Sequence, residues 1–225
     1  MIIGIAGFQG SGKDTIADYL QNIHGFKRDS FAATLKDAVA AVFGWDRELL
    51  EGRTKESRAW RETVDEWWAI RLAMPNLTPR LVLQLWGTEV ARRAFHDDTW
   101  IASLEYKLQK AHSDIVITDV RFPNEIQAVR RAGGVVIRVV RGPEPDWYET
   151  ALGANAGIVS DRELLKQLGI HPSETAWIGT HFDAVIDNNA DGLDPLYEQV
   201  KDLVLSLQGA TEDQLYLPLR YSFDK

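Results

Sequence analysis

Residues 7–15 read Gly7-Phe8-Gln9-Gly10-Ser11-Gly12-Lys13-Asp14-Thr15 and follow an apolar run that ends at Ala6. This order predicts a strand, a glycine-rich turn and a helix start within the first fifteen residues. Glycines let backbone N–H groups turn inward around a phosphate, and the N-terminus of the next helix adds partial positive charge. The spacing Gly-x-x-x-x-Gly-Lys therefore predicts a phosphate-binding loop, with Lys13 as a mobile charge for the β- and γ-phosphates.

The residue after Lys13 narrows the type of loop. The strict pattern has Ser or Thr directly after the lysine, whereas this chain has Asp14 there and Thr15 one place later. We therefore expect Thr15 to contact a phosphate, and magnesium to be held largely through water. Asp14 has two interpretations, as part of the phosphate site or as a carboxylate that complements the helix dipole.

Composition excludes several classes of protein. A length of 225 residues suits one domain of ordinary size with a small insertion, and a net charge of −8 argues against a general nucleic-acid or anionic-membrane surface. No cysteine is present, so there is no disulfide framework, and the five histidines lack a zinc spacing. The N-terminal run lacks the features of a signal peptide, and no stretch approaches the ~20 apolar residues of a membrane span. We expect a cytoplasmic protein without a membrane partner.

Apolar runs alternate with helical spacing along the chain, which predicts an α/β fold with a parallel sheet covered by helices on both faces. The expected strands are 1–6, 27–31, 115–119, 135–140 and 184–187. The expected helices are 13–23, 32–43, 100–111, 123–132 and 194–207, and one that enters at Thr78-Pro79 and continues through Val90.

Two stretches interrupt this alternation. Residues 45–80 are rich in Trp, Arg and Glu and predict two or three helices, whereas residues 141–180 carry Gly, Pro and charge without a clear strand. Two movable flaps suit phosphoryl transfer, because the site must close to keep water from the transferred group. We expect a single domain with core residues 1–44, 81–140 and 181–208, and a tail, 209–225, that packs on the body or on a partner subunit.

Two polar positions follow expected strands. Asp119 ends the strand 115–119, interpreted as the central strand, so it faces the crevice at the carboxyl edge of the sheet. There it holds magnesium through water or orients Arg121, which can grip a phosphate with two hydrogen bonds; a structural ion pair is the alternative. Asn188 follows the strand 184–187, where a nucleotide base would rest, although Asn188-Asn189 is also a common turn sequence.

Five further residues each have two interpretations. Gln84 and Arg92, about two turns apart on one helix, line an acceptor site or belong to a solvated face. Lys36 lies next to the crevice or in solvent. Arg141, after the strand 135–140, stacks on an adenine or reaches the transferring phosphates. Glu174 belongs to a functional flap or to a turn and helix start.

Several blocks, taken in order, resemble the bacteriophage deoxynucleoside monophosphate kinases. The phosphate loop is specific for phosphate but not for this family, so the family assignment rests on Gln84…Gly87-Thr88 and Asp119-x-Arg121. The resemblance covers about residues 1–207 and is weakest in the middle of 45–80. The blocks are Gly10 to Thr15, Ala32 to Lys36, Leu83 to Arg92, Asp119 to Glu125, Val135 to Arg141 and His171 to Glu174.

The resemblance implies a three-layer P-loop kinase fold and transfer of the γ-phosphate of ATP to a deoxynucleoside 5′-monophosphate, with Mg²⁺. It makes 45–80 the acceptor-binding insertion and 141–180 the lid, and it allows a homodimer in the host cytoplasm. The implied catalytic residues are Lys13, Arg121 and Arg141. The implied ATP site is Gly10, Ser11, Gly12, Lys13, Asp14, Thr15 and Asn188. The implied substrate site is Lys36, Gln84, Arg92, Asp119, Arg121 and Glu174, with Thr15 and Asp119 near the metal through water.

Other functions stay open at this point. One is a different small-molecule kinase on the same fold, such as a dephospho-coenzyme A or sugar-acid kinase, although the long Trp/Arg-rich insertion favours a nucleotide acceptor. Another is a nucleotide sensor that binds ATP without transferring phosphate. A DNA-acting motor is disfavoured by the acidic charge and the single small domain. The sequence identifies neither the acceptor base, modified pyrimidines included, nor the choice between ATP and GTP.

Overall fold

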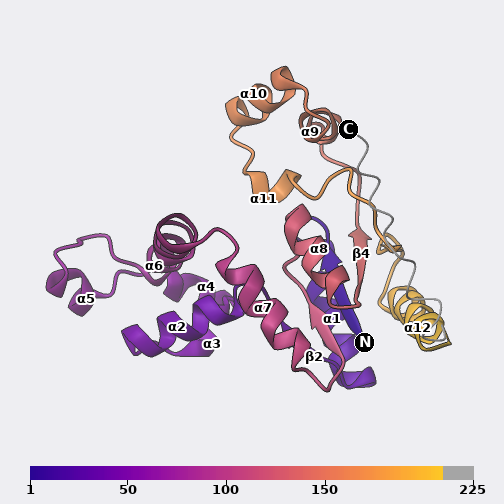
Figure 1. The fold of residues 1–225 in the computed structure, drawn as a ribbon, viewed down its shortest axis with the longest axis horizontal. Coiled ribbons are helices and arrows are strands. Elements are labelled where there is room, and N and C mark those ends of the chain that lie inside the picture. Colours follow the sequence, from indigo (N-terminus) through magenta and orange to yellow (C-terminus); the bar gives the residue numbers. More distant parts are fainter. Residues whose placement is uncertain (210–225) are drawn as a thin grey trace, which may run out of the picture. The chain divides into compact units, whose positions relative to one another are not determined.

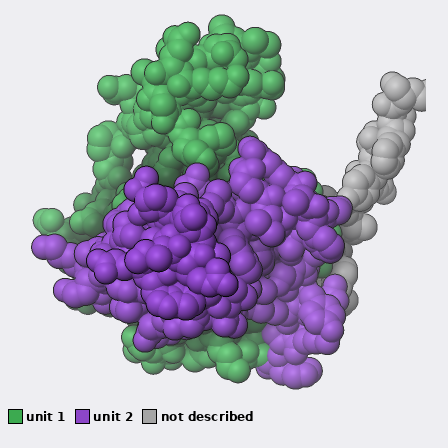
Figure 2. All heavy atoms as spheres, turned by 90° about the vertical axis from the view of Figure 1, so that its left-hand side faces the viewer, with its two compact units in different colours: residues 1–28, 113–225 green, residues 29–112 purple. Residues whose placement is uncertain are grey.

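The computed structural model describes residues 1–209 of the chain. Its described residues form two compact units, one of residues 1–28 and 113–209 and the other of residues 29–112 (Figure 2). The predicted insertion 45–80 falls within the second unit, and the predicted lid 141–180 falls within the first. The tail 210–225 lies outside the described residues, so the packing expected for it stays a prediction.

A five-stranded sheet with the order β2-β3-β1-β4-β5 forms the centre of the first unit (Figure 1). Its middle strand, β1, runs parallel to β3 on one side and to β4 on the other, and β5 runs parallel to β4. The residues that follow these strands therefore meet at one edge, the usual place for ligands in such sheets. The strands are β1 (Ile2–Ala6), β2 (Lys27–Asp29), β3 (Ile115–Ile117), β4 (Val135–Val140) and β5 (Ala184–Asp187).

The expectation that Asp119 ends the central strand is wrong on both counts. The central strand is β1, and β3 ends at Ile117, where its register with β1 stops opposite Gly4. Beyond that point β1 pairs with β4 alone, so Asp119 has no strand partner on β1 and lies in the loop before α8. Strand β2 likewise ends at Asp29, two residues earlier than expected.

Helices cover both faces of this sheet, which confirms the three-layer α/β fold. Ile3 and Ile5 of β1 are fully buried in one apolar core with α1 and α12. Gly4 faces the opposite side, where a β-carbon would lie 3.2 Å from Val129 of α8. The helices of this unit are α1 (Lys13–His24), α8 (Pro123–Arg131), α9 (Tyr148–Asn155), α10 (Val159–Gln167), α11 (Pro172–Thr175) and α12 (Asp194–Gly209).

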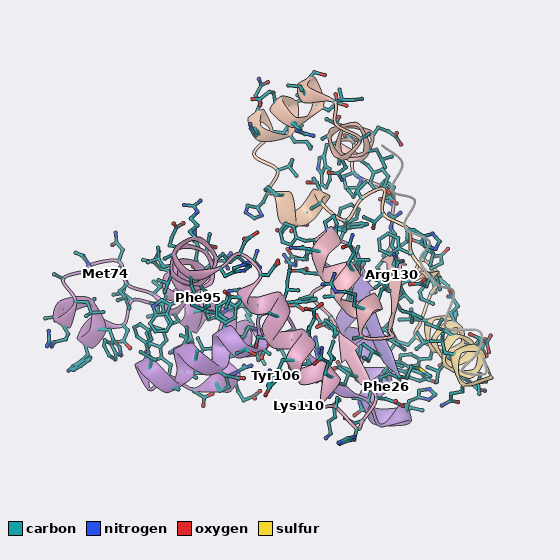
Figure 3. The ribbon with its side chains drawn as sticks, in the orientation of Figure 1. Phe26, Met74, Phe95, Tyr106, Lys110 and Arg130 are labelled. Carbon is teal, nitrogen blue, oxygen red and sulfur yellow. The ribbon has the colours of Figure 1, made fainter. Side chains whose placement is uncertain are left out.

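Side chains labelled in Figure 3 help to hold this unit together. Phe26, just before β2, is 4% exposed and belongs to the core between α1 and the sheet. Arg130 of α8 donates to the carbonyl of His181 at 2.8 Å and pairs with Asp183 at 3.3 Å. Asp183 also accepts from the Val136 N–H at 2.7 Å, so the segment that enters β5 is fixed to both β4 and α8.

The second unit is helical and has an aromatic core. The Phe43 ring lies 4.5 Å from Trp45, 4.8 Å from Trp68 and 5.7 Å from Trp86, measured between ring centroids. Three short helices precede Thr78, as predicted for residues 45–80. The elements are α2 (Ala33–Phe43), α3 (Arg47–Glu51), α4 (Lys55–Arg61), α5 (Glu66–Arg71), α6 (Pro79–Gln84), η1 (Leu85–Phe95) and α7 (Thr99–Gln109).

The helix expected from Thr78 through Val90 changes its geometry partway. Thr78 caps α6 by accepting from the Leu81 N–H at 3.1 Å, as its sequence predicts. From Leu85 the chain forms a π-helix, η1. Its turn is wider than that of an α-helix, so Gln84 and Arg92 no longer have the α-helical spacing that would place them on the same side of one helix. Trp100 donates to the Gly87 carbonyl at 2.9 Å, and a side chain bonded into the helix ladder is a known cause of such distortion.

Candidate active site

The predicted phosphate loop connects β1 to α1 and depends on two glycines. Gly7 has φ 142°, and a β-carbon there would lie 2.6 Å from the Val139 carbonyl oxygen. Gly12 has φ 108°, and a β-carbon there would lie 2.5 Å from Nδ2 of Asn188. Both positions exclude other residues, because the backbone is left-handed and its neighbours are in contact.

Lys13 is the first residue of α1, and its side chain turns back over the loop. Its Nζ donates to the carbonyls of Gly7 and Phe8, both at 2.7 Å. The amine is thereby held at the mouth of the loop, next to the N–H groups that begin α1. This is where phosphate oxygens would meet both a cation and the positive end of a helix.

Burial lowers the pKa of Lys13 from 10.5 to about 8. The charge of Arg121 acts in the same direction, whereas the carboxylates of Asp14 and Glu174 oppose it. Lys13, Arg121 and Glu174 therefore act on one another although 108 and 53 residues separate them in sequence, counted from their numbers. The first unit by itself brings these three predicted site residues together.

Arg121 lies in the loop between β3 and α8. Its Nη1 is 3.9 Å from Oε1 of Glu174, and both side chains are partly exposed. The backbone at Arg121 is fixed by Glu125, a buried residue whose Oε2 accepts from the N–H groups of Arg121 at 2.7 Å and Phe122 at 3.1 Å. The sequence motifs do not identify Glu125 as a site residue. The pattern that could have identified it is an acidic residue two places after Pro123, in the first turn of a helix.

The polar residues of the loop have different surroundings. Asp14 forms an ion pair with Arg28, which also donates to the Thr118 hydroxyl at 3.2 Å. Arg28 thus connects the start of α1 to the end of β3, a role for Asp14 that neither of its interpretations contained.

Thr15 is partly buried in the first turn of α1. Ser11 is 4% exposed, and its Oγ has no hydrogen-bond partner within residues 1–209.

Asn188 follows β5 and is bonded to the loop itself. Its side-chain Nδ2 donates to the Ser11 carbonyl at 2.8 Å, and its own N–H donates to the Val140 carbonyl at 2.8 Å. The neighbouring Asn189 accepts from the Gly142 N–H at 2.6 Å. The turn after β5 therefore contacts both the phosphate loop and the start of the segment 141–180.

Of the other predicted residues, two follow strands of the first unit and three belong to the second unit. Asp119 is partly buried in the loop after β3, and Arg141 is exposed just after β4. Gln84 is exposed at the end of α6, and Arg92 is partly buried in η1. Gln84, Arg92 and Lys36 all belong to the second unit.

Lys36 is not a solvated helix lysine. Its side chain is 14% exposed, and Nζ lies 2.6 Å from Oε2 of Glu51, which also accepts from Arg47 at 2.5 Å. Burial raises the pKa of Glu51, but hydrogen bonds and charge from Lys36 and Arg47 outweigh it and lower that pKa to about 2. An acceptor phosphate would have to compete with Glu51 for the Lys36 amine.

Two classes of site are missing from the described part of the chain. Among residues 1–209, no group of three or more His, Asp or Glu side chains gathers closely enough to hold a metal ion. Over the same residues, no helix has the length and apolar character needed to span a membrane.

A parallel three-layer α/β fold with a Gly-x-x-x-x-Gly-Lys loop between β1 and α1 defines a P-loop kinase. No family model matches the chain. The chain is 30% identical over 215 residues to a protein of Acanthamoeba polyphaga mimivirus whose provisional name is deoxynucleotide monophosphate kinase, covering 89% of this chain and 94% of that protein. It is also 30% identical over 179 residues to the deoxynucleoside-5′-monophosphate kinase of Escherichia phage T5, covering 58% and 72% respectively.

The chain therefore belongs to the deoxynucleoside monophosphate kinase family, and it is an enzyme of the nucleotide kinase class. The family resemblance read from its sequence blocks is confirmed. A crystal structure from Thermus thermophilus is similar over 93% of this chain and 98% of that one, with 20% identity and a TM-score of 0.44. A similarity at that level supports no conclusion about activity.

Proposed function

We propose that this enzyme transfers the γ-phosphate of ATP to a deoxynucleoside 5′-monophosphate, giving the deoxynucleoside diphosphate and ADP. The observation that carries the proposal is that Lys13 and Arg121 lie close enough beside the glycine loop for their charges to interact, and that Glu174 pairs with Arg121. The names of the mimivirus and phage T5 relatives support the acceptor class.

The reaction asks the protein mainly for positioning and positive charge. An acceptor phosphate oxygen is already anionic, so it attacks the γ-phosphorus without a general base, and the bond from that phosphorus to the bridging β–γ oxygen breaks as ADP leaves. In this scheme Gly10, Ser11, Gly12 and the start of α1 supply backbone N–H groups to the ATP phosphates. Lys13 and Arg121 neutralise the charge that develops on the transferred group.

The segment 141–180 is proposed as the lid. Arg141 stands at its entrance, next to the bond between Gly142 and Asn189, and Glu174 is its contact with Arg121. When the lid closes, Arg141 would approach the transferring phosphates, and water would be excluded from them.

Mg²⁺ bound with ATP would supply positive charge that neutralises part of the charge of the phosphates. It prefers oxygen ligands and keeps several waters, so it needs few protein groups. The chain offers two such groups, the hydroxyl of Thr15 in the first turn of α1 and the carboxylate of Asp119 in the loop after β3. We propose that both residues hold the ion through water.

The acceptor side is proposed to lie in the insertion 45–80 and the helices around it. Lys36, Gln84 and Arg92 are its candidate contacts, with Lys36 exchanging Glu51 for the acceptor phosphate. A cytoplasmic setting and independence of nucleic acid and membranes are expected from the sequence, and the host cytoplasm is expected from the family resemblance. A homodimer is compatible with the proposal.

Transfer of a radiolabelled γ-phosphate tests the proposal directly. The wild-type enzyme with Mg²⁺ and labelled ATP should label a deoxynucleoside monophosphate as its diphosphate, separated by chromatography, and Lys13→Ala should not. Dephospho-coenzyme A and a sugar acid serve as competing acceptors. Label in either of them, with none in any deoxynucleotide, would overturn the proposal.

A further inference from the structure

The side chain of Phe8 points out of the phosphate loop into a group of aromatic rings. Its ring centroid lies 4.8 Å from that of Trp177 and 5.6 Å from that of Trp147, in edge-to-face geometry, and 6.4 Å from that of Tyr148. All three partners come from the segment 141–180, and all four residues belong to the first unit. A residue that the loop pattern leaves free therefore joins the loop to the proposed lid.

The rings around Phe8 are themselves firmly held. Trp177 is 2% exposed, so it is part of the interior of this unit. The guanidinium carbon of Arg138, on β4, lies 5.2 Å from the ring centroids of both Tyr148 and Trp177. Arg138 also donates to the Tyr148 hydroxyl at 3.0 Å. Edge-to-face and cation–π contacts of this kind favour one orientation of the rings, so the cluster is a fixed support for the Phe8 side chain.

The backbone of Phe8 connects this support to the catalytic lysine. The Phe8 carbonyl accepts from Nζ of Lys13 at 2.7 Å, as does the carbonyl of Gly7. Fixing the Phe8 ring limits rotation of the peptide that carries this carbonyl. On the other side of the loop, Asn188 bonds the Ser11 carbonyl at 2.8 Å. The loop is thus anchored at two points, and Phe8 is the one whose own side chain contacts the segment 141–180.

We propose that Phe8 is a positioning residue, whose ring, packed against Trp147 and Trp177, holds the phosphate loop in its binding conformation and couples it to the segment 141–180. The proposal rests on the proposed function only in taking ATP as the ligand of the loop. Phe8 itself needs no contact with the substrate. Binding at the loop should consequently change the surroundings of Trp147.

The test compares Phe8→Leu with Phe182→Leu. Leucine keeps position 8 apolar but removes the ring edges. Phe182 lies outside the loop, and its ring centroid is 6.1 Å from that of Trp177, so Phe182→Leu is a control that removes an aromatic ring from the same cluster without changing the loop. Binding of ATP with Mg²⁺ is measured by calorimetry, turnover by ADP release, and stability by thermal unfolding. The change in tryptophan emission at saturating ATP is recorded with and without Trp147→Phe to isolate Trp147.

Phe8→Leu should bind ATP about tenfold more weakly, since two aromatic edge contacts that order the loop are lost. At saturating ATP it should also have lower kcat and lose the Trp147 emission change. Phe182→Leu should keep wild-type ATP affinity, kcat and emission change, whatever its loss of unfolding temperature. If Phe8 had only a structural role, the ATP affinity and kcat of both variants would fall in proportion to their loss of stability.

Wild-type affinity and kcat in Phe8→Leu, or equal losses in Phe182→Leu, would overturn the proposal. If Phe8→Leu does not fold, Trp147→Leu removes the same contact from the other side, with the same expected and contradicting results for ATP affinity and kcat. Failure of the proposed function is separable. A wild-type enzyme that binds ATP but phosphorylates no deoxynucleotide refutes that function, while the comparison of ATP affinities still decides the role of Phe8.

Discussion

The guanidinium group of Arg121 lies 3.9 Å from the carboxylate of Glu174, joining the loop after β3 to the start of α11. Both side chains are partly exposed, 49% and 38% respectively, so the pair should contribute under about 1 kcal/mol to stability. Its value lies instead in where it holds Arg121, beside the amine of Lys13. If Arg121 binds the transferring phosphate as proposed, Glu174 should act through Arg121.

A double-mutant cycle tests that relationship. Glu174→Gln should reduce kcat/KM for the acceptor several-fold with an unchanged unfolding temperature, and Arg121→Ala should reduce it more while leaving ATP affinity nearly intact. In the Arg121→Ala background, Glu174→Gln should have almost no further effect, because residues that act as a unit are not additive. Fully additive losses would mean that Glu174 acts on the substrate independently of Arg121.

Removing the Lys13 amine should abolish most of the turnover without disturbing the fold. Lys13→Ala deletes the charge at the loop but leaves the apolar core of the first unit intact. We expect kcat to fall by roughly 10²-fold or more, the scale seen when a transition-state charge loses its partner. Circular dichroism and thermal unfolding supply the control. Near-normal turnover would remove Lys13 from the mechanism.

Nucleotide binding should take up protons near pH 8. The pKa of Lys13 is lowered to about 8 by burial, then by Arg121, with Asp14 and Glu174 opposing, so the free amine is only partly protonated there. A triphosphate favours the charged form and raises that pKa, so binding at pH 8 draws a proton from the buffer. Calorimetry in buffers of different ionisation enthalpy measures the uptake. It should vanish in Lys13→Ala and at pH 6; an unchanged uptake in Lys13→Ala would assign the proton elsewhere.

The contact between Asn188 and the phosphate loop predicts a clear difference between two neighbouring residues. Asn188→Asp replaces the donor at 2.8 Å from the Ser11 carbonyl by a carboxylate oxygen, which repels that carbonyl. We expect ATP binding to weaken about tenfold or more, because a buried carbonyl loses its partner and the loop loses an anchor. Asn189→Asp keeps the side-chain oxygens that can accept from Gly142 and should bind ATP normally. Equal affinities of the two variants would show that Asn188 is only a turn residue.

Glu51 should make the second unit sensitive to acid. Lys36 and Arg47 lower its pKa from 4.5 to about 2 in the folded protein, against the effect of burial. A carboxyl whose folded pKa is lowered stabilises the fold above its unfolded pKa, and that stability is lost as the pH falls from about 4.5 to 2. Urea unfolding of wild type and Glu51→Gln should differ by at most about 3 kcal/mol at pH 7 and converge near pH 2. A difference independent of pH would contradict the ion-pair account.

Two strands have the bounds that the sequence predicted, Val135–Val140 and Ala184–Asp187. Val135–Val140 is a continuous apolar run paired on both sides, by β1 and β5, and its bounds match the prediction. Asp119 was misplaced because the end of β3 is set by where its pairing with β1 stops, which depends on another strand. The change to a π-helix at Leu85 depends on Trp100, sixteen residues past the last α-helical residue, Gln84. Local patterns do not contain that contact.

The residues of the candidate site also divide into those that local sequence predicts and those that depend on distant partners. The loop itself is readable, because glycines and a lysine at fixed spacing have a direct physical meaning. The sequence allows two interpretations of Lys36, because its partner Glu51 lies on another helix. Phe8 gave no signal, because its position in the loop accepts any residue and its partners, Trp147 and Trp177, are about 140 and 170 positions away.

The most direct test of the central claim is turnover across paired acceptors. ADP release should be measured with Mg²⁺ and ATP for each deoxynucleoside 5′-monophosphate, its ribonucleotide counterpart and modified deoxypyrimidine monophosphates, with Lys13→Ala as the blank. The account predicts fast turnover on one or a few deoxy acceptors and a much smaller kcat/KM for their ribo counterparts. Tight ATP binding with no turnover on any monophosphate would contradict it and favour a nucleotide sensor or a kinase for another small molecule.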